Sequence, residues 1–273
     1  MNKRTIAPKL LLFIALGLLK GGRIFAQTPE KSKSSTLGIS LGYSFNGYRE
    51  ETILDINRYL NTLIYSINGS IENNRFYHSF HFGFFRGNLE VKMAYPVYQY
   101  EQQPDIFGQL FKYYNMEDTY TRIFFEYALD YRLWGNKTFP GYLGGAVRVD
   151  AYLLETLRNP VYINFTGLAS LNLHAGQKWI INSKNSISFF FSFPVFAYAI
   201  RPHYIGFSAW PVESGIASLH NYWAGFGNLK YQYIIYRWFS LYSDLGLEIT
   251  RIDFPKPRRD ASISLSLGTA FAF

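Results

Sequence analysis

The segment ISLSLGTAFAF at positions 263–273 decides the fold, because its side chains alternate between two kinds. Large apolar residues share one face, and small residues share the other: Ile263, Leu265, Leu267, Phe271 and Phe273 against Ser262, Ser264, Ser266, Gly268, Ala270 and Ala272. A period of two predicts a β-strand, since successive side chains point to opposite faces of a sheet. A water-facing surface usually carries many Lys and Glu residues. The small, uncharged face therefore fits the crowded lumen of a barrel better than a solvated surface.

The segment 120–133 alternates in the same way, with charged residues in place of the small ones. Its apolar face carries Ile123, Phe125, Tyr127, Leu129, Tyr131 and Leu133, and its polar face carries Arg122, Glu126, Asp130 and Arg132. The same pattern predicts about ten strands along the chain. They cover 36–48, 58–72, 76–92, 117–133, 140–154, 162–180, 186–199, 220–236, 239–251 and 261–273.

The predicted connections alternate in length. Short ones fall at 73–75, 135–139, 182–185 and 236–238, and longer ones at 49–57, 93–116, 155–161, 200–219 and 252–260. An even-stranded transmembrane barrel with both termini in the periplasm has short turns on that side and long loops outside. Trp134, Trp179 and Trp238 fall beside the short turns, where an interfacial aromatic girdle would lie.

The segment 263–273 resembles the C-terminal assembly signal of bacterial outer-membrane barrels, whose last strand alternates apolar residues and ends on an aromatic residue such as Phe273. The resemblance implies an all-β fold, a transmembrane antiparallel up-and-down β-barrel of about ten strands, with eight or twelve as alternatives. It implies a bacterial outer-membrane location, both termini periplasmic, with membrane lipid, lipopolysaccharide and the barrel-assembly machinery as partners. It implies no activity, because one architecture carries many functions.

The first 26 residues have the pattern of a cleavable signal peptide. Lys3, Arg4 and Lys9 precede an apolar run at 10–19, and Ala26 supplies a small residue before the cut. We predict a signal peptide at 1–26, a short periplasmic leader at 27–35 and the barrel at 36–273. The segment 1–26 holds five of the 27 basic residues, and the remaining 22 against 19 acidic ones give a formal charge of +3. The basic balance is thus no argument for nucleic acid, and we expect none as a partner.

A barrel of about ten strands has a narrow lumen, between those of filled eight-stranded barrels and open porins. On the face assigned to the lumen, six basic residues meet six acidic ones: Arg86, Lys92, Arg122, Arg132, Arg148 and Lys230 against Glu90, Glu126, Asp130, Asp150, Asp244 and Glu248. Balanced buried charges predict a plug held by ion pairs, although a proton or ion path is an alternative. We predict that Arg122, Glu126, Asp130 and Arg148 belong to one lumen network on adjacent strands. We expect no cofactor. His78 and His81 have opposite parity and cannot converge on a metal ion.

Three functions fit such a barrel: a structural or surface-interaction role, a narrow solute conduit, and an enzyme that cleaves outer-leaflet lipid or peptide. For lipid cleavage the available catalytic pair is Ser218 and His220, which share strand parity. The motif at 220–223 resembles the His motif of lipid A deacylases but lacks the Ser two residues after the His. Omptin-type proteases also have about ten strands, yet no paired-carboxylate motif carries over. Ser170, Asn172 and His174 form a second polar set, for which we expect hydrogen bonding in the lumen.

The long connections at 93–116 and 200–219 are the candidates for recognition, because long loops on a rigid scaffold are where function concentrates. Both contain many aromatic residues, which bind glycans or proteins through stacking and large contact area. The residues that we single out are Tyr98, Tyr100, Phe107, Tyr204 and Trp210. The alternative is that these side chains pack against one another as a lid.

Overall fold

A computed structural model describes residues 34–50, 54–73, 75–91, 118–156, 163–202, 212–218, 221–253 and 257–273. Strands account for nearly all of these residues: β1 (Ser34–Glu50), β2 (Leu54–Glu72), β3 (Phe76–Val91), β4 (Asp118–Trp134), β5 (Gly141–Thr156), β6 (Ile163–Ile180), β7 (Asn185–Pro202), β8 (Val212–Ser218), β9 (Tyr222–Tyr236), β10 (Phe239–Ile252) and β11 (Arg258–Ala272). Within the described ranges, no helix is long and apolar enough to cross a membrane.

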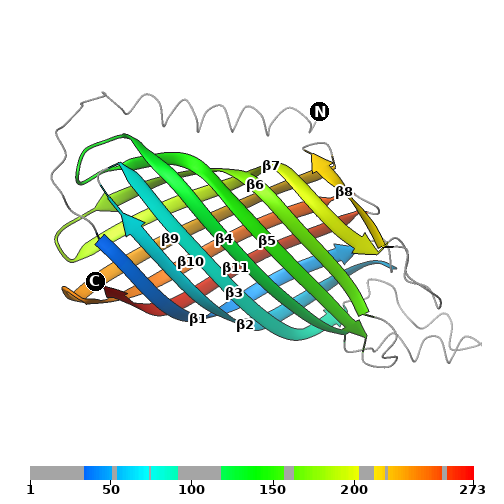
Figure 1. Ribbon diagram of the computed structural model, residues 1–273. Coiled ribbons are helices and arrows are strands. Elements are labelled where there is room, and N and C mark those ends of the chain that lie inside the picture. The colour runs from blue at the N-terminus through cyan, green and yellow to red at the C-terminus, as the bar shows by residue number, and fades with distance from the viewer. Residues whose placement is uncertain are drawn as a thin grey trace, which may run out of the picture.

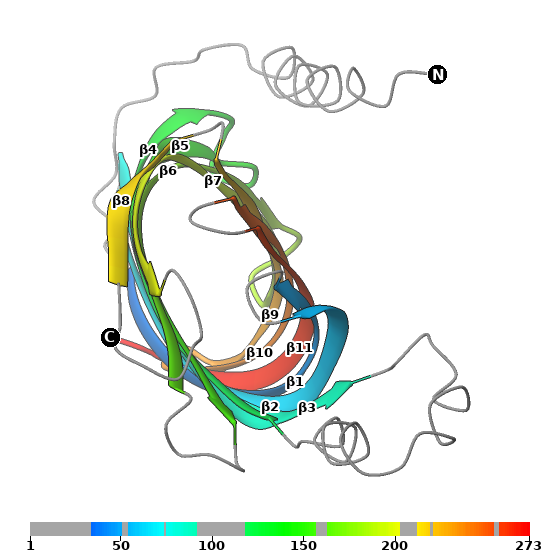
Figure 2. The same ribbon diagram turned by 90° about the vertical axis from the view of Figure 1, so that its right-hand side faces the viewer.

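The strands close into an antiparallel barrel of ten strands (Figures 1 and 2). From β1 to β8 each strand pairs with the next along the chain, as do β9 with β10 and β10 with β11, and the β1–β11 ladder closes the ring, with Thr36 opposite Ala272. One edge of β7 has two partners: Asn185–Ser192 pairs with β9, and Phe196–Pro202 pairs with β8. β8 and β9 thus occupy one position in the ring. The start of β1 and the end of β11 lie together at the end with the short connections.

The predicted fold class is confirmed, and all ten predicted segments contain strands. The interpretation of the region around 200–222 was wrong in part. The predicted loop 200–219 contains β8, and the predicted strand 220–236 starts at Tyr222. The connections predicted as 49–57, 155–161 and 252–260 are also shorter, because the flanking strands extend into them. The contrast in connection length therefore depends mainly on 92–117 and 203–221.

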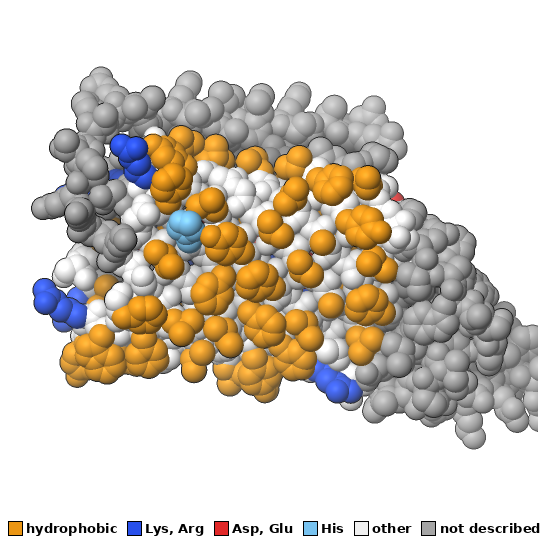
Figure 3. Space-filling view, in the orientation of Figure 1, with side chains coloured by type: hydrophobic (Ala, Val, Ile, Leu, Met, Phe, Trp, Pro, Cys, Tyr) orange, Lys and Arg blue, Asp and Glu red, His pale blue; other side chains and the backbone are white. Residues whose placement is uncertain are grey.

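The outer wall is apolar, as the alternation of the last strand predicts. Leu267 is 68% exposed and Phe273 79%, whereas Ser266 and Ala270 are buried on the inward face. On the face shown in Figure 3, hydrophobic side chains spread over the described part of the wall, and Lys and Arg lie near its ends. A wall of this kind is stable in lipid but not in water.

Trp134, Trp179 and Trp238 lie beside the short connections. The indole of Trp134 donates a 2.8 Å hydrogen bond to Oε1 of Gln177, while Trp179 and Trp238 are exposed on the outer wall. At the 135–140 turn Gly135 has a φ of 86°, a left-handed conformation that favours glycine. The short connections and the exposed indoles fit one interfacial end of the barrel.

Aromatic rings cover glycines on neighbouring strands. The ring of Phe124 occupies the place where Gly83 lacks a side chain, and Phe190 does the same at Gly176. In each pair the two residues are direct register partners. The same arrangement occurs at Gly69 with Phe80, Gly141 with Trp134, and Gly268 with Tyr242. Each glycine therefore provides a space that its partner's ring fills.

Two apolar clusters fill the lumen toward the end opposite the short connections. One spans β1 to β5 and contains Tyr48, Leu60, Phe85, Tyr120, Tyr152 and Leu154. The other spans β6 to β10 and contains Leu168, Ala197, Ala199, Ala217, Tyr222, Ala224, Phe226 and Ile252. Both consist of buried side chains, so this half of the barrel is packed like a protein core.

Candidate functional site

Ion pairs cross the lumen between these two apolar clusters. Arg122 on β4 binds Asp150 on β5, with Nη2 to Oδ1 at 2.6 Å, and also pairs with Glu248 on β10. Arg148 binds the same two carboxylates, with Nε to Asp150 Oδ2 at 2.8 Å and Nη2 to Glu248 Oε2 at 3.2 Å. Its Nη1 lies 3.6 Å from Glu126 Oε2. These five side chains, here called the lumen cluster, connect β4 and β5 with β10 across the barrel.

Aromatic rings surround both guanidinium groups. The Arg148 guanidinium lies 3.9 Å from the centre of the Phe226 ring, and Arg122 lies 4.7 Å from that of Tyr152. Such contacts stabilise cations most where water is excluded. Ion pairs that are buried, shared and stacked on rings hold the side chains in one arrangement. The lumen cluster therefore holds its side chains in one arrangement across the lumen.

Asp130 belongs to a different group, although the sequence analysis placed it in one network with Arg148. Asp130 is fully buried and accepts a 2.8 Å hydrogen bond from Nδ1 of His174 on β6. The two side chains meet across Gly144 of β5, where a Cβ would contact Asp130. The His174 ring stacks on Phe190 at 5.3 Å. This pair lies nearer the end with the short connections than the lumen cluster does.

The other residues predicted to line the lumen form further groups. Lys230 donates a hydrogen bond to Asn68 and lies 4.0 Å from the Tyr242 ring, while Asp244 accepts one from Asn228. Arg132 shares the inward parity of Asp130 and lies within electrostatic range of Glu72, which binds Lys178 at 2.8 Å. The predicted single network is thus several separate clusters.

The inward assignment of Arg86 was wrong. Its neighbour Phe85 is the register partner of Arg122 and faces the lumen, so Arg86 faces outward and is exposed. Arg86 lies ten residues beyond the first residue of β3 at Phe76. A tilted strand of about 9–11 residues crosses the hydrocarbon layer, so an arginine at this distance can reach the outer boundary of the membrane. Lys92 and the Glu90 side chain lie outside the described residues.

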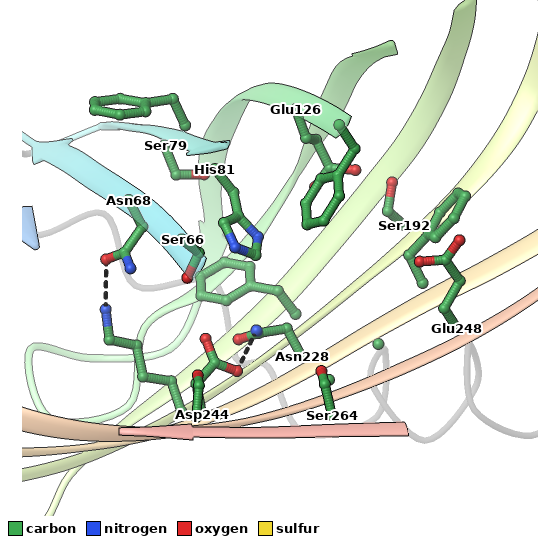
Figure 4. Close-up of a pocket in the computed structure, with 18 of the residues that line it drawn as sticks. Ser66, Asn68, Ser79, His81, Glu126, Ser192, Asn228, Asp244, Glu248 and Ser264 are labelled. Carbon is green, nitrogen blue, oxygen red and sulfur yellow. Dashed lines mark hydrogen bonds between the residues drawn. The ribbon is translucent and has the colours of Figure 1, made fainter. Parts of the chain in front are cut away.

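A polar cavity of about 170 Å³ lies in the lumen next to the lumen cluster. Its lining contains many hydroxyls, including those of Ser66, Ser192 and Ser264, together with the His81 ring (Figure 4). The His81 ring packs edge-on against Phe124 at 5.0 Å. An apolar cavity of similar size stays dry and binds benzene, but a polar one holds water or a small polar solute. The cavity is too small for a phospholipid.

The catalytic candidates gain no support from the described residues. The Ser218 side chain and His220 lie outside them, so this pair stays a prediction. His174 has a carboxylate partner in Asp130, but the Ser170 hydroxyl has no hydrogen-bond partner and so does not bond to it. The parts of the chain that the structure describes hold no group of three His, Asp or Glu residues arranged for a metal ion.

His78 faces outward, where Nδ1 lies 2.8 Å from the Tyr127 hydroxyl, whereas His81 lines the cavity. Their predicted divergence is therefore confirmed. The predicted recognition residues Tyr98, Tyr100, Phe107, Tyr204 and Trp210 all lie outside the described residues.

One ion pair was missed because the last strand starts earlier than predicted. Arg258 and Asp260 fall in the predicted connection 252–260, but both belong to β11 and bond at 2.9 Å. Arg258 also donates to the Tyr120 hydroxyl. The parity of Ser262 and Ser264 extends backward to both residues, and this signal could have assigned them to the lumen.

No family model and no curated protein matches the sequence. Among solved structures, the chain is similar to the outer membrane protease OmpT from Escherichia coli, with a TM-score of 0.54 and 7% identity over 92% of this chain and 99% of that chain. The fold is that of an outer-membrane β-barrel. At such low identity the likeness shows the fold alone.

Two further structures have lower TM-scores. The translocator domain of the autotransporter NalP from Neisseria meningitidis scores 0.42 at 9% identity, with 98% of this chain and 97% of that chain covered. The attachment invasion locus protein Ail of Yersinia pestis scores 0.34 at 12% identity, with 89% and 100% covered. These likenesses assign no activity to this chain.

Proposed function

We propose that this barrel is a closed, non-conducting scaffold of the outer membrane, with a rigid outer half that holds surface loops for contact with a partner. The observation that carries the proposal is the lumen cluster, whose ion pairs cross the barrel from Arg122 and Arg148 to Glu248. Apolar clusters pack on both sides of it. A ten-stranded lumen filled in this way has no continuous aqueous path.

The orientation that fits best has both termini in the periplasm. The ends of β1 and β11 lie at the end with the short connections, where the exposed Trp179 and Trp238 would meet the membrane interface. The exposed apolar face of β11 would be presented to the barrel-assembly machinery. The outer wall would then meet lipopolysaccharide at the opposite end. Protease protection of intact cells, with an epitope inserted in the short connection at 182–184, tests this orientation.

The segments 93–116 and 203–211 are the parts that we propose for recognition of an extracellular glycan or protein. Aromatic side chains such as Tyr98, Tyr100 and Trp210 supply the contact area that such binding needs. Replacing each with Ser should weaken adhesion of expressing cells to the partner surface and leave the amount of folded barrel unchanged. Unchanged adhesion in all three variants would remove these residues from the proposal.

Conductance across a planar bilayer tests the closed lumen. The purified barrel should give no steady current steps, because charged and apolar side chains fill its cross-section. A variant with Arg148 and Glu248 both changed to Ala should conduct, since it loses the cross-lumen contacts and keeps the wall. Steady steps from the unmodified protein would overturn the proposal and favour a narrow conduit. Modified lipid A in expressing cells, detected by mass spectrometry, would instead favour an enzyme.

A further inference from the structure

Several buried polar atoms in and beside the lumen cluster have no hydrogen-bond partner among the residues that the structure describes. They include Oε2 of Glu126, Oγ of Ser170, both amide atoms of Asn172, and Oγ of Ser192. Ser192 is 2% exposed, and Ser170 and Asn172 are 4% exposed. Native proteins leave few buried polar atoms unsatisfied, because each one loses its hydrogen bonds to water and gains none in return. We call these four side chains the unsatisfied cluster.

The strand register places these side chains on one part of the wall. Glu126, Arg148 and Ser170 form one row across β4, β5 and β6, and Ala128, Ala146 and Asn172 form the next. The two alanines leave space beside the Asn172 amide. Ser192 follows on β7, opposite His174. Glu126 and Ser192 both line the cavity and turn into it (Figure 4).

The ladder between β6 and β7 is irregular at the same level. Its register shifts between Leu171 and Asn172, so Asn172 pairs with Pro194. Proline has no N–H to donate, and it occurs in sheets mainly at edges and bulges. Bulges of this kind re-aim side chains and are common next to functional sites. The irregularity therefore coincides with the unsatisfied cluster.

The lumen cluster also has an excess of negative charge. Arg122 and Arg148 carry two positive charges, and Glu126, Asp150 and Glu248 carry three negative ones. Glu126 is the least well paired of the three, because its nearest guanidinium nitrogen in these pairs lies at 3.6 Å. Water could satisfy the polar atoms, but it would leave the charge uncompensated, and that is costly in a buried site.

We propose that the unsatisfied cluster binds a small monovalent cation, such as Na⁺, K⁺ or ammonium. The Glu126 carboxylate supplies the charge, and the Ser192 hydroxyl, which lines the same cavity, supplies a second oxygen, the kind of ligand that hard cations prefer. One positive charge balances the lumen cluster. Divalent sites usually combine several carboxylates, whereas this cluster has one. The bound ion would link β4 and β7 at the edge of the plug.

Ion-dependent unfolding tests the proposal. The barrel in detergent is heated in NaCl, KCl or NH₄Cl, and in N-methylglucamine chloride at the same ionic strength, and loss of the fast-migrating gel band is recorded. At a concentration ten times the dissociation constant, at least one small cation should shift the folding equilibrium by about tenfold. The variants Glu126→Gln and Ser192→Ala should lose this shift. The control Glu72→Gln, at a carboxylate paired with Lys178, should retain it.

Three results would overturn the proposal: equal stability in all four salts, an unchanged shift in a folded Ser192→Ala variant, or a larger shift with CaCl₂ or MgCl₂. If Glu126→Gln does not fold, Ser192→Ala decides the outcome. Crystals soaked in thallium acetate give a direct answer. An anomalous peak between Glu126 and Ser192 supports the site, and no peak in that space rejects it.

Discussion

Replacing Arg148 with Gln is the sharpest test of the lumen cluster. The Arg148 guanidinium contacts three carboxylates: Asp150 at 2.8 Å, Glu248 at 3.2 Å and Glu126 at 3.6 Å. It also lies over the Phe226 ring at 3.9 Å. Glutamine keeps part of the volume but carries no charge. The variant therefore leaves Arg122 as the remaining cation of the cluster, beside three carboxylates.

The expected cost follows from burial. Removing one partner of a buried ion pair destabilises a protein by about 3–5 kcal/mol, because the other charge is left unpaired. Arg251 provides a matched control, since its side chain binds Asp253 through Nε at 2.8 and 3.0 Å but is 53% exposed. An exposed pair contributes about 0.2–1 kcal/mol. Arg148→Gln should thus cost about 3 kcal/mol more than Arg251→Gln, a factor of roughly 100 in the folding equilibrium.

Urea unfolding in phospholipid vesicles, followed by the fluorescence of the five Trp residues, measures both variants. Migration of the unboiled protein on a denaturing gel shows that each variant starts from a folded barrel. If Arg148→Gln loses no more free energy of unfolding than Arg251→Gln, the ion pairs across the lumen do not stabilise the barrel. The lumen cluster would then not act as a rigid plug.

Two further substitutions have internal controls. A Cβ at Gly144 would lie 2.6 Å from the Cα of Asp130, so Gly144→Ala should lower the free energy of unfolding by about 1–3 kcal/mol. The control is Gly145→Ala, which should change this free energy little, because its Cβ meets only the Asn172 carbonyl oxygen, at 3.6 Å. On the outer wall, Leu267→Arg should cost about 2–4 kcal/mol near the bilayer centre, and Ile181→Arg, at a short connection, about 0–1 kcal/mol. Urea unfolding in vesicles checks both pairs, and equal losses within either pair would contradict the assigned positions.

The strands could be predicted because the two faces of a membrane barrel differ strongly in chemistry. A lipid-facing position such as Leu267 tolerates no charge, and its neighbour Ser266 must fit a crowded lumen, so the period of two is clear in the sequence. The inward positions of Arg122, Arg148 and Asp150 followed from this parity alone. Arg86 was assigned to the wrong face because, near the edge of the membrane, a charged side chain can point outward without contacting the hydrocarbon layer. There a charged residue no longer indicates the lumen-facing side of a strand.

The sequence alone does not predict which residues lie opposite each other on neighbouring strands. Asp130 meets His174 only because Gly144 leaves space between them, and that contact depends on the register of two ladders. Alternation fixes which face a residue takes but not which residue lies opposite. The break between β8 and β9 was hidden for a similar reason, since a strand interrupted in a long connection has no periodic signal of its own.

The rings that cover glycines have a consequence for assembly. A strand that slips by one residue exchanges its two faces, which lipid forbids. A slip of two residues keeps each side chain on its own face, so contact with lipid alone would not exclude it. It would, however, bring the Phe190 ring opposite His174 or Lys178 instead of the space at Gly176, and a slip between β3 and β4 would move Phe124 away from Gly83. Each ring–glycine pair therefore favours the native register of its own two strands. A strand that is misaligned by two residues is disfavoured by steric clashes, although its polar and apolar faces are correctly placed.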